Sequence, residues 1–297
     1  MTSRRDFLTT AAVGLGASSL RPEWALASDP PPEVKTALHG PVGLQLWSLR
    51  EQLKKDVPGT LAKVRPLGIR EVETAGTWGQ TAEGHRAALD KAGLRCQASH
   101  MGFERLRDDL AGTLKEAKTL GASWVVCPWI PHDDAKGFTR DDAMKAAVAF
   151  NRIGTAGKDE GLKFAYHCHG YEFVPAADGT LFDILAADSD PALVQFEVDV
   201  FWAKAGGVDP AQLIEKYQGR VPFLHVKDMK KGLKLPPGSS GAPDDTNVPV
   251  GTGQIDWVAV FRASMKSGTQ VYYIEDESPD PLRQIPQSLK YLAGLKL

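Results

Sequence analysis

The sequence has few cysteines and no concentration of charge of one sign, and each absence excludes a class of protein. Its 297 residues contain three cysteines, Cys96, Cys127 and Cys168. An odd number at such wide spacing does not describe a disulfide framework, so we expect three small, buried, apolar thiols. The formal net charge is −2, and no tract of lysine and arginine occurs. Nucleic acid is therefore not an expected partner.

The N-terminal region lacks a hydrophobic run long enough for stable membrane insertion. The apolar stretch 8–20 is rich in Gly, Ser and Thr, and it is shorter than the roughly 20 residues that a spanning helix needs. It follows Arg4-Arg5 and precedes Ala25-Leu26-Ala27. This order is typical of a twin-arginine export signal with its cleavage site; an ordinary amphipathic N-terminal helix is the alternative. We expect the export machinery as a partner and the periplasm or the cell exterior as the location.

The N-terminal signal and the length of the remaining chain predict the domain organisation. Residues 1–27 are the export signal, 28–40 a linker with prolines at its start, and 41–297 a single domain. A mature chain of roughly 270 residues is typical of one α/β barrel. The sequence leaves a monomer and a homo-oligomer equally open.

From residue 42 onward, short apolar runs alternate with amphipathic stretches. The expected strands are 42–47, 71–74, 94–100, 124–130, 163–169, 194–200, 221–227 and 271–275. The expected helices are 57–66, 82–92, 106–120, 141–160, 181–187, 210–217, 257–266 and 281–292. Eight strand–helix repeats predict an α/β fold, a single (β/α)8 TIM barrel. A doubly wound open sheet is the alternative, and it is disfavoured because no glycine-rich phosphate turn follows the first strand.

Several of these strands end in His, Asp or Glu. The alternation of side chains in a strand places His167 with His169, Glu197 with Asp199, His225 with Lys227, and Glu275 with Glu277. The carboxyl ends of parallel barrel strands meet at one face, and charged groups buried there need partners. A divalent cation with mixed nitrogen and oxygen ligands meets that need, and Mn, Mg, Co and Zn all suit such a set. Taken singly, each residue also fits a hydrogen-bonded structural role or a helix cap.

The segment 230–249 is a long loop rich in Gly, Pro and Asp after the seventh expected strand. Loops of this length are usually functional or flexible. Its place above the barrel mouth predicts a lid or a substrate-shaping element.

The chain resembles the sugar isomerase/epimerase superfamily with the xylose isomerase-like TIM barrel. The resemblance extends over almost the whole mature chain. The segments that carry it are Gly43-Leu44-Gln45-Leu46-Trp47-Ser48, Val72-Glu73-Thr74-Ala75, Tyr166-His167-Cys168-His169-Gly170-Tyr171-Glu172-Phe173, Asp199-Val200-Phe201-Trp202-Ala203, His225-Val226-Lys227-Asp228, Gly251-Thr252-Gly253-Gln254-Ile255-Asp256-Trp257 and Tyr272-Tyr273-Ile274-Glu275.

The resemblance implies a divalent metal held by residues of the last four barrel strands. Its expected ligands are His167, Asp199, His225 and Glu275. The fifth strand departs from the family, since many epimerases have a glutamate where this chain has His-x-His. Either histidine is a candidate ligand there, and Glu172 is a further alternative.

The resemblance also implies catalytic and substrate-binding residues. The expected catalytic residues are Glu275, Glu172, Lys227 and His169. The expected substrate-binding residues are Trp47, Glu73, His100, Trp129 and Trp202; for the three tryptophans, packing in the core is the alternative. Lys227 is expected to stabilise an oxyanion, and a salt bridge with Asp228 is the alternative.

These features predict a metal-dependent sugar or keto-sugar isomerase or epimerase that abstracts a proton next to a carbonyl. A metal-dependent lyase or hydrolase of keto-glycosides is the alternative enzyme. A non-catalytic periplasmic sugar-binding protein is the alternative of another class.

Overall fold

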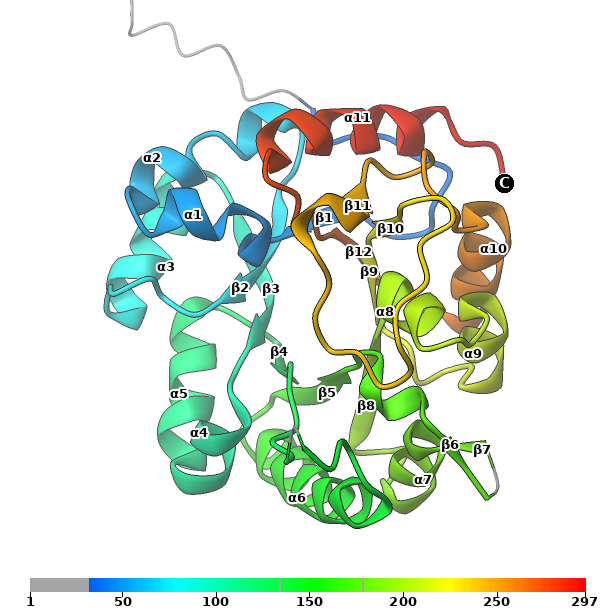
Figure 1. Ribbon diagram of the computed structural model, residues 1–297. Helices are drawn as coiled ribbons and strands as arrows, with labels where there is room; N and C mark the ends of the chain where they lie inside the picture. The colour runs from blue at the N-terminus through cyan, green and yellow to red at the C-terminus, as the bar shows by residue number, and fades with distance from the viewer. Residues whose placement is uncertain (1–31, 134, 178) are drawn as a thin grey trace, which may run out of the picture. The chain divides into compact units, whose positions relative to one another are not determined.

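The computed structural model describes residues 32–133, 135–177 and 179–297. A closed barrel of parallel strands lies at the centre of this part of the chain (Figure 1). The strand order is β1-β12-β9-β8-β5-β4-β3-β2, and every neighbouring pair is parallel. The eight strands are β1 Val42–Gln45, β2 Glu71–Ala75, β3 Arg95–His100, β4 Trp124–Cys127, β5 Lys163–His167, β8 Val194–Asp199, β9 Phe223–Val226 and β12 Val271–Ile274. The predicted (β/α)8 barrel is confirmed.

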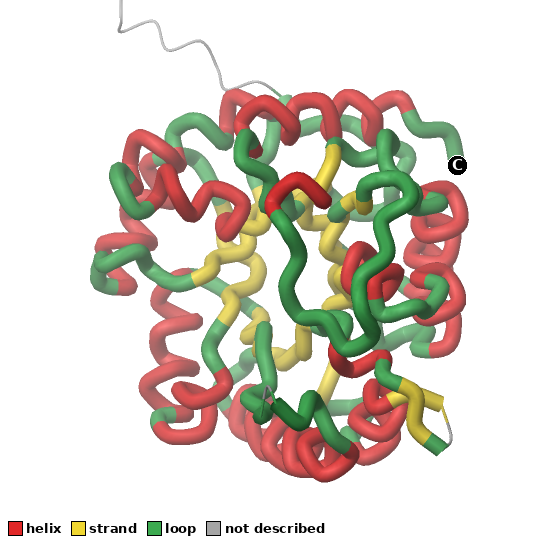
Figure 2. Tube along the Cα trace, viewed as in Figure 1, coloured by secondary structure: helices red, strands yellow, loops and turns green. Residues whose placement is uncertain are grey.

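Helices surround the barrel, as the red tubes around the yellow strands in Figure 2 show. Their bounds are α1 Arg50–Leu53, α2 Val57–Leu61, α3 Ala82–Lys91, α4 Phe103–Asp108, α5 Leu110–Leu120, α6 Arg140–Asp159, α7 Leu181–Asp188, α8 Val200–Ala205, α9 Pro210–Lys216, α10 Trp257–Ser267 and α11 Pro281–Gly294. The helix expected at 106–120 is divided in two. Asp109 has a non-helical backbone and caps α5 by accepting a hydrogen bond from the Gly112 N–H.

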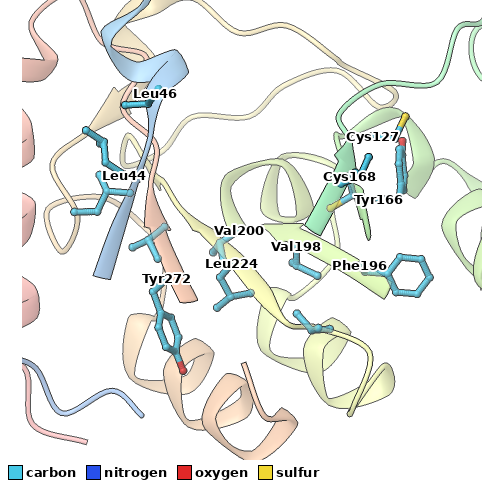
Figure 3. Close-up of a cluster of buried hydrophobic side chains, with 14 of the residues drawn as sticks. Leu44, Leu46, Cys127, Tyr166, Cys168, Phe196, Val198, Val200, Leu224 and Tyr272 are labelled. Atoms are coloured by element: carbon cyan, nitrogen blue, oxygen red, sulfur yellow. The ribbon is translucent and has the colours of Figure 1, made fainter. Parts of the chain in front are cut away.

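Alternation along the strands separates an apolar outer layer from a polar inner one. Tyr166, Phe196 and Val198 are among the buried side chains shown in Figure 3, and they belong to the core between strands and helices. A second apolar cluster, which includes Trp124, Phe223 and Tyr273, comes from the early part of several strands. Polar side chains follow it toward the strand ends. The three cysteines are free and buried, as expected.

The long loop after β9 is a strap across the barrel mouth (Figure 1). It leaves the barrel through β10 Asp228–Met229 and returns through β11 Asn247–Val248, which pair antiparallel. A second short hairpin, β6 Pro175–Ala176 with β7 Gly179–Thr180, follows β5.

The predicted export signal and the first residues of the predicted linker lie outside the described residues. The rest of the linker, 32–40, contains no helix or strand, and its Val34 N–H donates a hydrogen bond to the Gly68 carbonyl over 3.0 Å. Within the described ranges, no helix is both long enough and apolar enough to cross a membrane.

Candidate functional site

A cavity of about 490 Å³ opens where the barrel strands end. Residues 240–244 and 246 of the strap 230–246, together with Asn247 of β11, contribute one wall, which fits the predicted lid position. The predicted residues on its walls are Trp47, His100, Trp129, His167, His169, Trp202, Lys227 and Glu275. Most of the predicted substrate-binding and catalytic residues thus come together around one space.

Asp199, His225 and Glu275 form a group able to hold a metal ion, with ligand atoms all within 4.8 Å of one another. His225 Nδ1 lies 3.4 Å from Glu275 Oε2 and 3.8 Å from Asp199 Oδ2. Asp199 and His225 are fully buried, yet Asp199 Oδ2 and His225 Nδ1 have no hydrogen-bond partner. Burying such atoms unpaired is costly. A divalent cation can take a lone pair from each of these two atoms, so this set of donor atoms fits a metal ion.

His167 belongs to a second group, together with His100, Glu197 and His225, which takes part here through Nε2 instead of Nδ1. Glu197 Oε2 lies 2.9 Å from His100 Nε2, 3.2 Å from His167 Nδ1 and 3.1 Å from His225 Nε2. The rings of His167 and His225 are 4.4 Å apart between centroids. The structure therefore brings three of the four expected ligands into one group and places His167 beside that group.

Burial and neighbouring charges shift the pKa values of this inner layer. Burial lowers the pKa of His167 to about 4, and the His225 ring adds to the effect. Burial alone would lower the pKa of His100, but the carboxylates of Glu73 and Glu197 outweigh it and raise it to about 9. Burial raises the pKa of Asp199 to about 7.

Glu73, expected among the substrate-binding residues, lies one layer below the cavity wall. It is fully buried and is not among the residues that line the cavity. Its Oε2 accepts a hydrogen bond from Gln45 Nε2 over 2.6 Å and lies 2.8 Å from His225 Nε2. Direct contact between Glu73 and a ligand in the cavity is therefore not supported.

Lys227 is held by carboxylates at the cavity wall. Its Nζ donates to Glu275 Oε2 over 3.1 Å and to Glu277 Oε2, and it lies 5.5 Å from the centroid of the Trp202 ring. Burial alone would lower the pKa of Lys227, but the two glutamates outweigh it, so the ammonium stays charged. Asp228, the alternative partner, does not pair with Lys227. Its carboxylate accepts hydrogen bonds from Gly251, Gly253 and Trp257 instead.

Glu172, an expected catalytic residue, is turned away from the cavity. Its carboxylate accepts hydrogen bonds from the His169 N–H and from the Tyr166 hydroxyl, and it is fully buried. It does not line the cavity. The structure thus places Glu172 against the outer core and away from the cavity wall, and its catalytic role stays a prediction. His169 itself lines the cavity, with its ring 5.2 Å from Trp129 and 5.5 Å from Trp202.

Several residues of the site were absent from the predicted set. Strand alternation had placed Glu197 on one face with Asp199 and Glu277 on one face with Glu275, but neither glutamate was assigned a role. Gln45 and Asn247 carried no comparable signal. Asn247 lies on β11 and reaches the site because its side-chain oxygen accepts the Glu277 N–H over 2.6 Å.

Comparisons with known proteins agree with this architecture. A family model for the xylose isomerase-like TIM barrel matches residues 61–295. Inosose dehydratase of Lacticaseibacillus casei is 26% identical over 161 residues, 52% of this chain and 53% of that protein. The match thus spans about half the length of that relative. Inosose dehydratase of Geobacillus kaustophilus is 24% identical over 277 residues, 80% of this chain and 88% of that protein.

Solved structures share the fold. A sugar phosphate isomerase/epimerase from Parabacteroides distasonis superposes with a TM-score of 0.69 at 25% identity, over 88% of this chain and 99% of that one. The IOLI protein with a bound zinc atom superposes with a TM-score of 0.60 at 16% identity, over 85% of this chain and 94% of that one. The likeness to the IOLI protein shows the fold alone.

Proposed function

The chain belongs to the xylose isomerase-like TIM barrel family, and we propose that it is a divalent-metal-dependent enzyme that removes a proton next to the carbonyl group of a sugar or keto-sugar. The observation that carries the proposal is the pair of unpartnered, buried ligand atoms, Asp199 Oδ2 and His225 Nδ1, beside a cavity with a charged lysine on its wall. The names of the relatives, inosose dehydratase and sugar phosphate isomerase/epimerase, support a polyhydroxylated carbonyl compound as the substrate class.

The residues that would hold the ion are Asp199, His225 and Glu275, with His167 beside them. Bound there, a divalent ion polarises a carbonyl or hydroxyl oxygen of the substrate as a Lewis acid. Mixed carboxylate and imidazole ligands suit Mn, Mg, Co and Zn.

The chain's own groups bind and orient the substrate and move its proton. Trp129 and Trp202 line the cavity and offer apolar contact to a sugar, and the strap covers part of the barrel mouth. The ammonium of Lys227 faces the space where negative charge develops on the substrate oxygen. Burial holds the pKa of His169 well below its usual value, so its imidazole is neutral and can accept a proton.

The position of Glu172 favours a lyase as the second candidate. Epimerisation needs proton-transfer groups on both faces of the planar intermediate, and Glu172 is turned toward Tyr166. Elimination needs one base and one acid. The base removes the proton beside the carbonyl, a C=C bond forms as the C–O bond at the next carbon breaks, and the departing oxygen takes a proton. His100 lines the cavity, and a pKa raised to about 9 by Glu73 and Glu197 keeps it protonated near neutral pH, so it can serve as that acid.

Solvent exchange tests the proposal. The metal-loaded protein is incubated in D₂O with keto-sugars and inososes, and the products are followed by NMR. Deuterium at the carbon beside the carbonyl is expected. Inversion at that carbon identifies an epimerase, and an unsaturated ketone identifies a lyase. Metal-stripped protein and the Glu275→Gln variant are the controls. Calorimetric binding of the same sugars without any exchange would instead support a sugar-binding protein and contradict the proposal.

A further inference from the structure

A buried layer of polar side chains lies just below the cavity, around the Nε2 edge of His225. We infer that Glu73, assisted by Glu197, is a positioning residue that holds His225 in the tautomer with its proton on Nε2, which leaves the Nδ1 lone pair for a metal ion. The inference rests on the proposed function, since it concerns how the same site captures its metal.

The orientation of Gln45 identifies the Glu73 oxygen as a hydrogen-bond acceptor. The Trp47 N–H donates to Gln45 Oε1 over 3.0 Å, so the amide group of Gln45 points the other way. That amide donates to Glu73 Oε2 over 2.6 Å. Because Gln45 donates to it, Glu73 Oε2 acts as a hydrogen-bond acceptor in this layer.

The acceptor oxygens of two carboxylates face the same ring nitrogen. His225 Nε2 lies 2.8 Å from Glu73 Oε2 and 3.1 Å from Glu197 Oε2. All three side chains are fully buried. A nitrogen between two acceptors is stable only if it carries a hydrogen.

The other edge of the ring faces the metal group. In a neutral imidazole with its proton on Nε2, Nδ1 has a free lone pair. His225 Nδ1 lies 3.8 Å from Asp199 Oδ2 and has no hydrogen-bond partner. Asp199 Oδ1 is already engaged, since it accepts the Trp202 N–H over 2.9 Å, so Oδ2 is the oxygen left for a ligand role. Carboxylates behind a ligating histidine commonly orient it in this way.

The same layer admits a different arrangement. His100, His167 and Glu197 could hold a second ion together with His225 Nε2. That arrangement requires a lone pair on Nε2 and is incompatible with the proposed tautomer. The number of ions bound by each chain therefore separates the two.

The experiment is a calorimetric titration of cobalt(II) into the metal-free full chain, together with the visible absorption spectrum of bound cobalt. Glu73→Met removes the acceptor, and Glu73→Gln keeps its shape. Glu71→Gln is the matched control, because Glu71 lies on the same strand but pairs with Arg95. We expect one ion per wild-type chain. The Kd should rise about 10–100-fold in Glu73→Met, with an altered spectrum at saturation and a smaller change in Glu73→Gln. Glu71→Gln should match the wild type.

Three results would overturn the inference. The first is a wild-type Kd and spectrum in Glu73→Met, in protein whose circular dichroism is native. The second is an equal loss of affinity in Glu71→Gln, which would indicate general destabilisation. The third is two ions per wild-type chain with one lost in Glu197→Gln, which would make the buried layer itself a metal site. A wild-type chain that binds no cobalt would refute the proposed function as well, so the two failures are distinguishable.

Discussion

Lys227 and Glu275 form an ion pair at the wall of the cavity, with Nζ 3.1 Å from Oε2 and side chains only 2% and 7% exposed. The pair joins the charged lysine to a member of the metal group. Glu277 contacts the same ammonium from a position two residues further along the chain. The proposed substrate-binding and metal-binding roles thus fall on two residues that contact each other.

Replacing Lys227 with methionine should reduce turnover, and it should also lower the free energy of unfolding because Glu275 and Glu277 lose their partner. The ammonium is the group placed to stabilise charge on the substrate oxygen, and losing one such group typically lowers kcat by about 10²–10³-fold. Steady-state kinetics on the substrate found by the exchange experiment would measure this. Lys230→Met is the control, because Lys230 pairs with Asp245 on the exposed strap. A Lys227→Met variant with wild-type kcat would contradict the role.

Asp199→Asn should abolish tight metal binding without unfolding the barrel. Asparagine keeps the side-chain oxygen that caps α8, where Asp199 Oδ1 accepts the Trp202 N–H, but replaces the ligand oxygen with an amide. Metal at 100 times its Kd stabilises a protein by about 2.7 kcal/mol. The metal-induced rise in Tm should therefore disappear in the variant.

Asp209→Asn is the matched control for that change, because Asp209 caps α9 in the same way at an exposed position. It should keep the full metal-induced rise in Tm. Equal losses in both variants would assign the effect of Asp199 to capping.

Glu172 should affect the pH dependence of stability. Burial raises its pKa from 4.5 to about 7 in the folded protein. The neutral acid therefore contributes stability that is fully present below pH 4.5 and is lost as the pH rises through 7. The free energy of unfolding of the wild type, relative to Glu172→Gln, should fall over this window.

Urea denaturation at several pH values measures that difference. Kinetics provide the second readout, since Glu172→Gln should keep kcat near the wild-type value if the carboxylate has no contact with substrate. A large loss of kcat at unchanged stability would restore the catalytic role.

Asp228 should prove structural. Its carboxylate accepts from the N–H groups of Gly251 and Gly253 and from the indole N–H of Trp257, and it is fully buried. Asp228→Ala leaves these donors unpaired, which should lower the free energy of unfolding by about 3 kcal/mol. Asp245→Asn on the strap should change it little. Chemical denaturation of both variants would decide, and an Asp228→Ala variant as stable as the wild type would contradict this role.

The barrel could be predicted because its signals are local. Each strand is a short apolar run and each helix an amphipathic stretch, so their alternation needs no long-range information. Helix ends were less predictable. The break at Asp109 depends on one side chain capping the following helix, and α8 is short and buried on nearly all sides, which hides any amphipathic pattern.

For the site, the sequence predicted which strand ends carry its residues, but not how their side chains are arranged. Alternation assigned His167 and His169 to one face, and both line the cavity. Alternation gave no prediction for the direction of the Glu172 side chain, because Glu172 lies beyond the strand end in a 3-10 turn.

The sequence by itself therefore determined the barrel and the set of strand ends from which the candidate ligands come. Tertiary structure alone decided the pairings among them: Lys227 with Glu275 instead of Asp228, Glu73 beneath His225 instead of against the cavity, and His167 beside the metal group. The reason is geometric. Closure of the barrel brings residues up to 152 positions apart within 2.8 Å, and which of several equivalent polar groups meet depends on register and side-chain direction, which composition and periodicity do not encode.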